Sequence, residues 1–213
     1  MTATPEYWHS EKTPWDFPLL RTCVDSLTQH MHPGMRVLDV GCGNGFWANR
    51  FSKQGCEVVG IDPSRKGVKK ARLAYPAIRF EQLEAGPDVL SELAEDPFDL
   101  VVSFEVIEHC YGPMTWASGC FNALKAPGTF ICSTPYHGYL KNLAISIVNK
   151  WDWHWFPIRE GGHIKFWSRA TLGRLLAETG FDRGHIQFRG AGRLPFLWKT
   201  MVVKAVKQEH STM

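Results

Sequence analysis

The sequence predicts an α/β domain built on a mostly parallel sheet, and three features indicate this. Residues 36–49, RVLDVGCGNGFWAN, read as a short buried strand, a glycine-rich turn and the start of a helix. A second buried strand, 58–61, ends in the carboxylate of Asp62. Strand-like and helical patterns then alternate as far as residue 133. Because parallel strands need crossover connections, this alternation places helices on both faces of the sheet.

Apolar periodicity and the positions of Gly and Pro place the elements. The expected helices are 15–31, 46–54, 65–74, 87–94, 113–125 and 168–178. The expected strands are 36–40, 58–61, 78–80, 98–104, 129–133, 184–190 and 198–206. Ser168 is suited to begin the last helix and Gly180 to end it. The last two strands are expected to form an antiparallel hairpin that closes the sheet.

The bulk composition indicates one domain that spans residues 1–213. Hydrophobic residues make up 44% and charged residues 21% of the chain, which is ordinary for a soluble globular protein. A net charge of +3 without a basic stripe gives no case for a nucleic-acid surface. The six cysteines show no C-x-x-C spacing, so they indicate neither a zinc site nor a disulfide frame. With no signal-peptide pattern and no apolar run of about 18 residues, we expect a cytoplasmic protein.

The glycine turn has the spacing G-x-G-x-G, and Asp39 stands two residues before Gly41. Glycines are needed here because a Cβ would block both the tight turn and the approach of a ligand to the backbone. An acid this close to the turn would repel a phosphate, but it can face a cationic or zwitterionic ligand. Asp62 follows Gly41 by 21 positions, close to the offset at which an acid meets ribose hydroxyls.

Asp39, the glycine turn and Asp62 together resemble the class I S-adenosylmethionine (SAM) methyltransferases. The resemblance implies a Rossmann-like, seven-stranded sheet, SAM as cofactor and S-adenosylhomocysteine as product. It assigns the methionyl end of SAM to Asp39, the ribose to Asp62 and the adenine to Glu84, although relatives more often have Asp at this last position. A solvated Glu84 is the alternative. The implied SAM contacts are Asp39, Gly41, Gly43, Gly45, Asp62, Pro63, Leu83, Glu84, Ser103 and Phe104.

A second motif, Glu105-Val106-Ile107-Glu108-His109, follows the fourth strand. If this run is helical, Glu105, Glu108 and His109 lie on one face at the carboxyl end of the sheet. With FDLVVSFEVIEH and GTFICSTPYHG, the chain resembles the ubiquinone-biosynthesis O-methyltransferases from about residue 15 to 204. The resemblance implies that Glu105, Glu108 and His109 hold a divalent cation such as Mg²⁺. The alternative is that the glutamates cap or brace the helix while His109 acts as a general base or packs.

Residues 138–167 interrupt the alternation, and we call them the lid segment. They contain an amphipathic helix from Tyr139 to Val148 and the cluster Trp151-Asp152-Trp153-His154-Trp155. The resembling enzymes carry a lid here that covers a hydrophobic acceptor and contacts lipid, so peripheral membrane contact is expected. Burial of the tryptophans against the sheet is the alternative. His137 and His163 flank the segment, and either could take a proton from an acceptor hydroxyl or serve as a structural histidine.

The expected function is SAM-dependent O-methylation of a small phenolic, catecholic or quinol-like acceptor. The catalytic candidates are His109, His137 and His163, with or without a metal. One alternative is methylation of nitrogen, carbon or a carboxylate in a natural product or lipid, where chelators would have no effect. Another is a SAM-binding regulator that lacks turnover.

Overall fold

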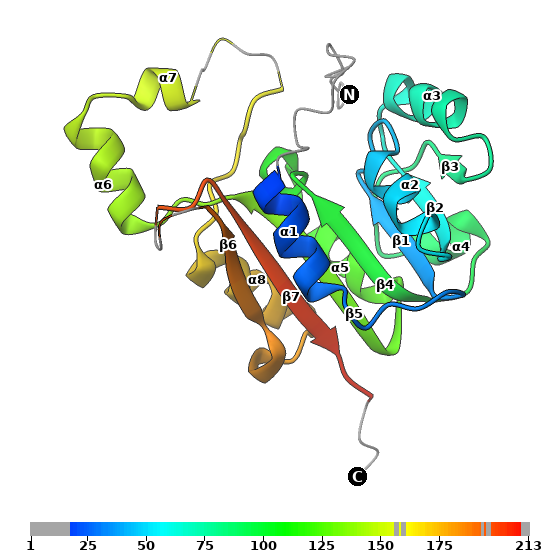
Figure 1. Ribbon diagram of the computed structural model, residues 1–213. Helices are drawn as coiled ribbons and strands as arrows, with labels where there is room; N and C mark the ends of the chain where they lie inside the picture. Colours follow the sequence, from blue (N-terminus) through cyan, green and yellow to red (C-terminus); the bar gives the residue numbers. More distant parts are fainter. Residues whose placement is uncertain (1–17, 156–157, 159–160, 193, 195–196, 210–213) are drawn as a thin grey trace.

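The computed structural model describes residues 18–155, 158, 161–192, 194 and 197–209 (Figure 1). Its seven strands form one sheet in the order β3-β2-β1-β4-β5-β7-β6. They are β1 (Arg36–Val40), β2 (Glu57–Ile61), β3 (Arg79–Glu81), β4 (Phe98–Phe104), β5 (Leu124–Pro135), β6 (Gln187–Ala191) and β7 (Thr200–Lys207). The first five strands pair in parallel, and β7 pairs antiparallel with both β5 and β6. The expected mostly parallel sheet with a closing antiparallel hairpin is confirmed.

Helices connect the parallel strands, as the alternation predicts. The described helices are α1 (Pro18–Leu27), α2 (Phe46–Ser52), α3 (Arg65–Ala74), α4 (Val89–Leu93), α5 (Pro113–Asn122), α6 (Tyr139–Ile147), α7 (Trp151–Trp155) and α8 (Arg169–Thr179). Two short 3₁₀ helices are η1 (Ile107–His109) and η2 (Arg183–His185). The predicted α3 has the same bounds as the observed helix, and residues 15–17 of the expected first helix lie outside the described residues.

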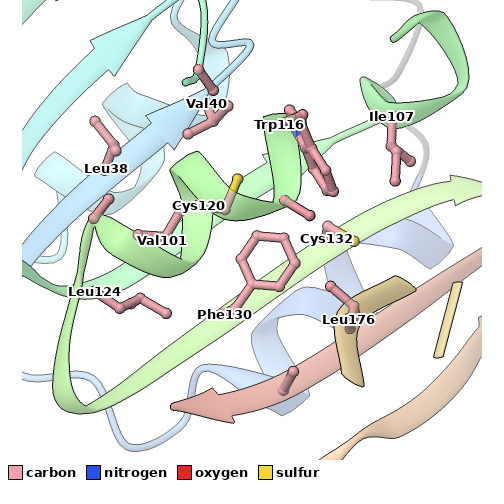
Figure 2. Close-up of a cluster of buried hydrophobic side chains, with 14 of the residues drawn as sticks. Leu38, Val40, Val101, Ile107, Trp116, Cys120, Leu124, Phe130, Cys132 and Leu176 are labelled. Carbon is pink, nitrogen blue, oxygen red and sulfur yellow. The ribbon is translucent and has the colours of Figure 1, made fainter. Parts of the chain in front are cut away.

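Alternate residues of the central strands β1 and β4 belong to two hydrophobic cores, one on each face of the sheet, and a third cluster packs α3 against β3. Val37 and Val102 pack with α1 and α2 on one face. Leu38 and Val101 pack with α4, α5 and α8 on the other (Figure 2). Neighbouring residues of β1 and β4 therefore belong to different cores, and the predicted continuous apolar runs follow from burial on both sides.

Helix caps explain where α8 begins and ends. The Ser168 side chain accepts a hydrogen bond from the Thr171 N–H, and the Thr171 side chain bonds back to the Ser168 N–H. Gly180 follows the helix with φ of 119°, a conformation that glycine adopts without strain. The predicted helix from the Ser168 cap to Gly180 is confirmed. The predicted strand 184–190 starts late, since Asp182 caps η2 and β6 begins only at residue 187.

A continuous helical turn from Glu105 to His109 is not formed. Glu105 has φ of 56°, which turns the chain sharply at the end of β4. The 3₁₀ helix η1 begins two residues later, at Ile107. The side chain of Glu105 therefore does not share a helix face with Glu108 and His109, and the expected common face of the three residues is wrong.

The lid segment extends away from the layered body of the domain (Figure 1). None of the residues in α6 or α7 is buried. Trp153 is 80% exposed and Ile147 75% exposed. The alternative in which the tryptophans are buried against the sheet is wrong for Trp153. In the described part of the chain, no helix has the length and apolar character needed to cross a membrane.

Candidate active site

The glycine turn lies between β1 and α2, at the carboxyl end of the sheet. Gly41, Gly43 and Gly45 all have positive φ, at 74°, 53° and 81°. A Cβ added to Gly41 would lie 2.3 Å from Cγ2 of Val106, in the segment after β4. The turn therefore needs glycine both for its backbone conformation and for close packing against the Glu105–His109 motif. The strand order reverses direction between β1 and β4, and open α/β sheets bind ligands at such a point.

Asp62 holds the glycine turn against the end of β2. One carboxylate oxygen accepts a hydrogen bond from the Gly43 N–H at 2.8 Å, and the other accepts one from the Ser64 N–H at 2.7 Å. Burial raises the pKa of Asp62 to about 6, although these two donors favour the ionised form. The carboxylate is thus fixed in orientation before any ligand arrives.

Asp39 is a buried carboxyl whose charge is poorly compensated. It is 2% exposed, and its Oδ2 atom has no hydrogen-bond partner among the described residues. Burial raises its pKa to about 7, the Ala48 N–H lowers it and the charge of Asp62 raises it further. Two carboxyls with raised pKa values beside a glycine turn suit a ligand that brings a positive charge.

The remaining predicted cofactor residues lie on the same edge of the sheet. Ser103 is buried in β4 and donates a hydrogen bond to the Val40 carbonyl at 2.8 Å. Phe104 is buried against Trp47 of α2, with ring centroids 4.4 Å apart. The Leu83 N–H donates to the Asp62 carbonyl at 3.2 Å, which places the 82–85 segment beside β2. Pro63 is half-buried and Glu84 is exposed, so their contacts with SAM stay predictions.

Glu105 and Glu108 form a buried acidic pair behind this edge, 6% and 1% exposed. Glu105 accepts hydrogen bonds from the hydroxyls of Ser133, at 2.8 Å, and Thr200. Burial raises the pKa of Glu105 to about 7. Burial, followed by the charge of Glu105, raises the pKa of Glu108 well above its ordinary value. Sequence reasoning missed Ser133 and Thr200, because only strand pairing brings β5 and β7 next to the motif.

Glu108 lies in a second group, with His109 and His163. One ligand atom from each of these three residues falls within 4.8 Å of the others. Glu108 accepts a hydrogen bond from Thr134 through Oε2 at 2.9 Å, while its Oε1 atom is buried without a partner among the described residues. The two imidazole rings lie with centroids 5.0 Å apart. The structure thus brings Glu108 and His109 together with His163, and Glu105 is not part of this group.

Backbone contacts fix the end of the lid segment beside η1. The Glu108 carbonyl accepts hydrogen bonds from the N–H groups of Ile164 and Lys165, at 2.9 and 3.0 Å. The His109 Nδ1 atom lies 3.2 Å from the Gly162 carbonyl. When Nδ1 donates to that carbonyl, Nε2 carries the lone pair. His163, although 54 positions from His109, is therefore a neighbour because of these contacts.

His137 lies apart from that pair. Its backbone N–H donates a hydrogen bond to the Trp167 carbonyl at 2.9 Å. The centroid of its ring lies 4.6 Å from that of Phe166 and 5.4 Å from that of His154. Burial, and then the charge of Lys141, lowers the pKa of His137 to about 4. The imidazole is neutral at neutral pH, but a group with so low a pKa is a weak base.

The fold and this site define an α/β protein with a glycine turn and two buried carboxyls at the carboxyl edge of a parallel sheet, where open α/β sheets bind ligands. Residues 14–185 match the family described as methyltransferase domain. Since this match covers most of the sequence, the chain belongs to the methyltransferase-domain family.

Similar sequences are the ubiquinone biosynthesis O-methyltransferases. The protein of that name from Cereibacter sphaeroides strain ATCC 17023 is 31% identical over 152 residues, which cover 70% of this chain and 61% of that protein. The protein of that name from Ruegeria sp. strain TM1040 is 29% identical over 178 residues, covering 82% of this chain and 70% of that protein. The chain thus spans about three fifths of the first relative. The expected resemblance is confirmed.

Solved structures agree with the fold. A SAM-dependent methyltransferase from Archaeoglobus fulgidus has a TM-score of 0.66 at 18% identity, over 89% of this chain and 93% of that one. A Burkholderia thailandensis 1,6-didemethyltoxoflavin-N1-methyltransferase, solved with S-adenosylhomocysteine, has a TM-score of 0.64 at 19% identity. That alignment covers 91% of this chain and 80% of the neighbour. At these identities the likeness establishes the Rossmann-like architecture alone.

Proposed function

We propose that this protein is a SAM-dependent methyltransferase that methylates an oxygen of a small phenolic, catecholic or quinol-like acceptor. The observation that carries the proposal is the pairing of two sites at one sheet edge. Asp39, the glycine turn and Asp62 suit a cationic nucleoside, and the buried glutamates and half-buried histidines lie at the end of the neighbouring strand β4. The ubiquinone O-methyltransferase relatives favour oxygen as the atom that is methylated.

The chain's main contribution to the reaction is alignment. SAM supplies a methyl group on a positively charged sulfur, which an acceptor oxygen displaces in line to leave S-adenosylhomocysteine. Asp62 would bind the ribose hydroxyls, while Asp39 and the turn would face the methionyl end. The walls provided by Phe104 and Val106 would exclude water near the methyl group. Holding two reactants in this geometry is worth several kcal/mol of a reaction barrier, on the order of 7–11 kcal/mol at best.

A divalent cation fits the group formed by Glu108, His109 and His163. The orphaned Oε1 atom of Glu108 is a buried acceptor without a donor, which a cation would satisfy. One carboxylate and two imidazoles favour Zn²⁺, Mn²⁺ or Fe²⁺ over Mg²⁺, because Mg²⁺ prefers oxygen ligands. When bound, such an ion lowers the pKa of a coordinated hydroxyl. In the metal-free alternative, His109 or His163 takes the acceptor proton.

We also propose that the outer surface of the lid segment makes peripheral contact with a membrane, as a cytoplasmic enzyme with a hydrophobic acceptor would require. The large apolar residues on this surface are Tyr139, Leu140, Leu143, Ile147 and Val148. Flotation with phosphatidylglycerol vesicles measures this contact directly. We expect wild type to float and a Leu143→Glu/Ile147→Glu variant to stay in the dense fraction; a wild type that never floats would sink the proposal.

The reaction is tested by release of S-adenosylhomocysteine from a panel of catechols, prenylated phenols, amines and carboxylic acids. Each acceptor is assayed with and without chelator, in wild type and in Glu108→Gln. We expect turnover on a catechol or phenol that falls at least 10-fold with chelator and in the variant. Turnover confined to amines or acids would contradict O-methylation. Turnover of a phenol at the same rate with and without chelator would contradict a role for the metal, and the acceptor proton would then be taken by a histidine.

A further inference from the structure

The half-buried residues of helix α6 include two polar side chains, whereas most of its large apolar side chains are exposed. Lys141, Asn142 and Ile145 are its half-buried residues. The other residues of the helix, including Tyr139, Leu143 and Ile147, are exposed. A helix that only covered a hydrophobic core would have the opposite orientation. The inner side of α6 is therefore arranged to meet something polar.

Lys141 is a partly buried cation that forms no ion pair with any residue that the structure describes. Its Nζ atom donates one hydrogen bond, to the Tyr136 carbonyl at 2.6 Å. Within the described ranges no carboxylate oxygen lies within 4.0 Å of Nζ, although the charge of Glu105 is near enough to act on it. An ammonium group has three donors, so two remain for a ligand. Burial lowers the pKa of Lys141 to about 8, as expected for a cation that lacks a contacting anion.

Asn142 adds an unused hydrogen-bond acceptor next to this cation. Its side chain lies close enough to the ring of His137 to affect the pKa of that imidazole. Its Oδ1 atom is buried and has no partner among the residues that the structure describes. A buried amide oxygen of this kind is costly unless a donor reaches it, and a hydroxyl group of a ligand would be such a donor.

A hollow near the inner side of α6 is large enough for a small aromatic molecule, although neither Lys141 nor Asn142 lines it. A hollow of about 300 Å³ is lined by Ile145, Lys150, Trp153 and His154, and Ile145 is one helical turn from Lys141. His154 also packs against His137, which the Asn142 side chain contacts. Burial, and then the charge of Lys141, lowers the pKa of His154, so these two residues lie near each other. A lining of one aliphatic and two aromatic side chains with the cation Lys150, and with Lys141 close by, matches the composition of small-molecule sites.

We propose that the inner side of α6 is the acceptor-recognition site, in which Lys141 binds a carboxylate of the methyl acceptor and Asn142 accepts a hydrogen bond from one of its hydroxyls. This inference rests on the proposed function and narrows the acceptor to a hydroxylated aromatic acid. One ammonium with two available donors matches a monoanionic carboxylate. Lys141 is thus a specificity residue outside the reacting groups.

A structural role for Lys141 gives a different expectation. If the ammonium only ties α6 to the Tyr136 carbonyl, its removal would weaken all acceptors equally. If it binds a carboxylate, its removal would weaken acids and spare their neutral amides. Lys141→Met keeps the apolar stem but removes the charge, and Lys141→Arg keeps the charge. Lys69→Met, on the exposed side of α3, is the control with the same change in net charge.

The test measures binding of 3,4-dihydroxybenzoate and 3,4-dihydroxybenzamide to the full chain loaded with S-adenosylhomocysteine, by calorimetry. We expect wild type, Lys141→Arg and Lys69→Met to prefer the acid by about 10- to 100-fold, the size of a charge-assisted hydrogen bond. Lys141→Met should lose this preference while it binds the amide as wild type does. Asn142→Leu should weaken both ligands together.

Equal binding of acid and amide by wild type, a preference that survives in Lys141→Met, or no binding of either ligand would each overturn the inference. Release of S-adenosylhomocysteine from SAM is followed with the same two acceptors. Acid binding that depends on Lys141 without any methyl transfer would leave the recognition site standing. It would contradict O-methylation of this acceptor.

Discussion

At the scale of single residues, the two buried aspartates of the glycine-turn site differ in their hydrogen-bond partners. Asp62 receives two backbone N–H donors, whereas Asp39 has one oxygen without a described partner. Both lie at the edge of the glycine turn, so the apo protein buries more acid than it neutralises. A cationic ligand would offset the free-energy cost of burying these charges. Without the ligand, the cost should appear as a free energy of unfolding that depends on pH.

Asp39 predicts how stability changes with pH. Its folded pKa of about 7 lies above the ordinary value of 3.8, so the folded state holds the proton more tightly than the unfolded state. The resulting cost is absent below about pH 4, grows as pH rises and is complete above about pH 7. From pH 5 to pH 8 it amounts to roughly 2–3 kcal/mol at 1.36 kcal/mol per pKa unit.

Urea unfolding of wild type and Asp39→Asn at pH 5 and pH 8 measures this cost. The variant cannot ionise, so its free energy of unfolding should fall by about 2–3 kcal/mol less than that of wild type between the two pH values. Titrating groups remote from Asp39 are common to both proteins and cancel in the comparison, whereas the charge of the neighbouring Asp62 acts on Asp39 and its effect is included in the difference. If the free energy of unfolding changes with pH by the same amount in both proteins, the pKa of Asp39 is not raised by burial and this prediction is wrong.

At the scale of elements, η1 and the end of the lid segment form one unit. The Glu108 carbonyl accepts two N–H groups from residues 164 and 165, and His163 stands beside His109. A cation bound there would join these two elements more firmly. The expected third ligand is thus His163 from the lid segment, while Glu105 is engaged with Ser133 and Thr200.

Calorimetric titration of Zn²⁺ and Mn²⁺ into the protein distinguishes these ligand sets. We expect His163→Ala and Glu108→Gln each to weaken metal binding by at least 10-fold, since each removes one of three ligands. Glu105→Gln, a change in the other member of the acidic pair, should bind metal within about 3-fold of wild type. If Glu105→Gln loses metal binding while His163→Ala binds metal as wild type does, the ligands would instead be Glu105, Glu108 and His109, as the E-x-x-E-H motif suggests.

Sequence patterns predicted the elements that depend on local signals. The glycine turn, the Ser168 cap and the bounds of α3 follow from residue preferences within a few positions. The turn at Glu105 could not be predicted, because a non-glycine residue at φ of 56° has no local signal. The neighbours of the motif escaped prediction too, since Ser133, Thr200 and Lys141 reach it only through strand pairing and the lid segment.

At the scale of the whole molecule, the sheet order decides where chemistry can occur. The turn after β1 and the motif after β4 come from adjacent central strands, so residues more than 60 positions apart in the chain meet at one edge. The lid segment, inserted after β5, supplies the other wall with Lys141, Asn142 and His163. In the proposed function, the first strands would supply the cofactor side of the site and the last elements the acceptor side.

The central claim is that this edge binds SAM, and calorimetric titration of SAM into wild type and Asp62→Asn tests it most directly. We expect wild type to bind with a micromolar dissociation constant, on the order of −8 kcal/mol. The Asp62 variant should bind at least 10-fold more weakly, while Asp182→Asn, a matched change in the η2 cap, should bind as wild type does. Absence of SAM binding in the folded wild type, or equal affinity in the Asp62 variant, would contradict the account.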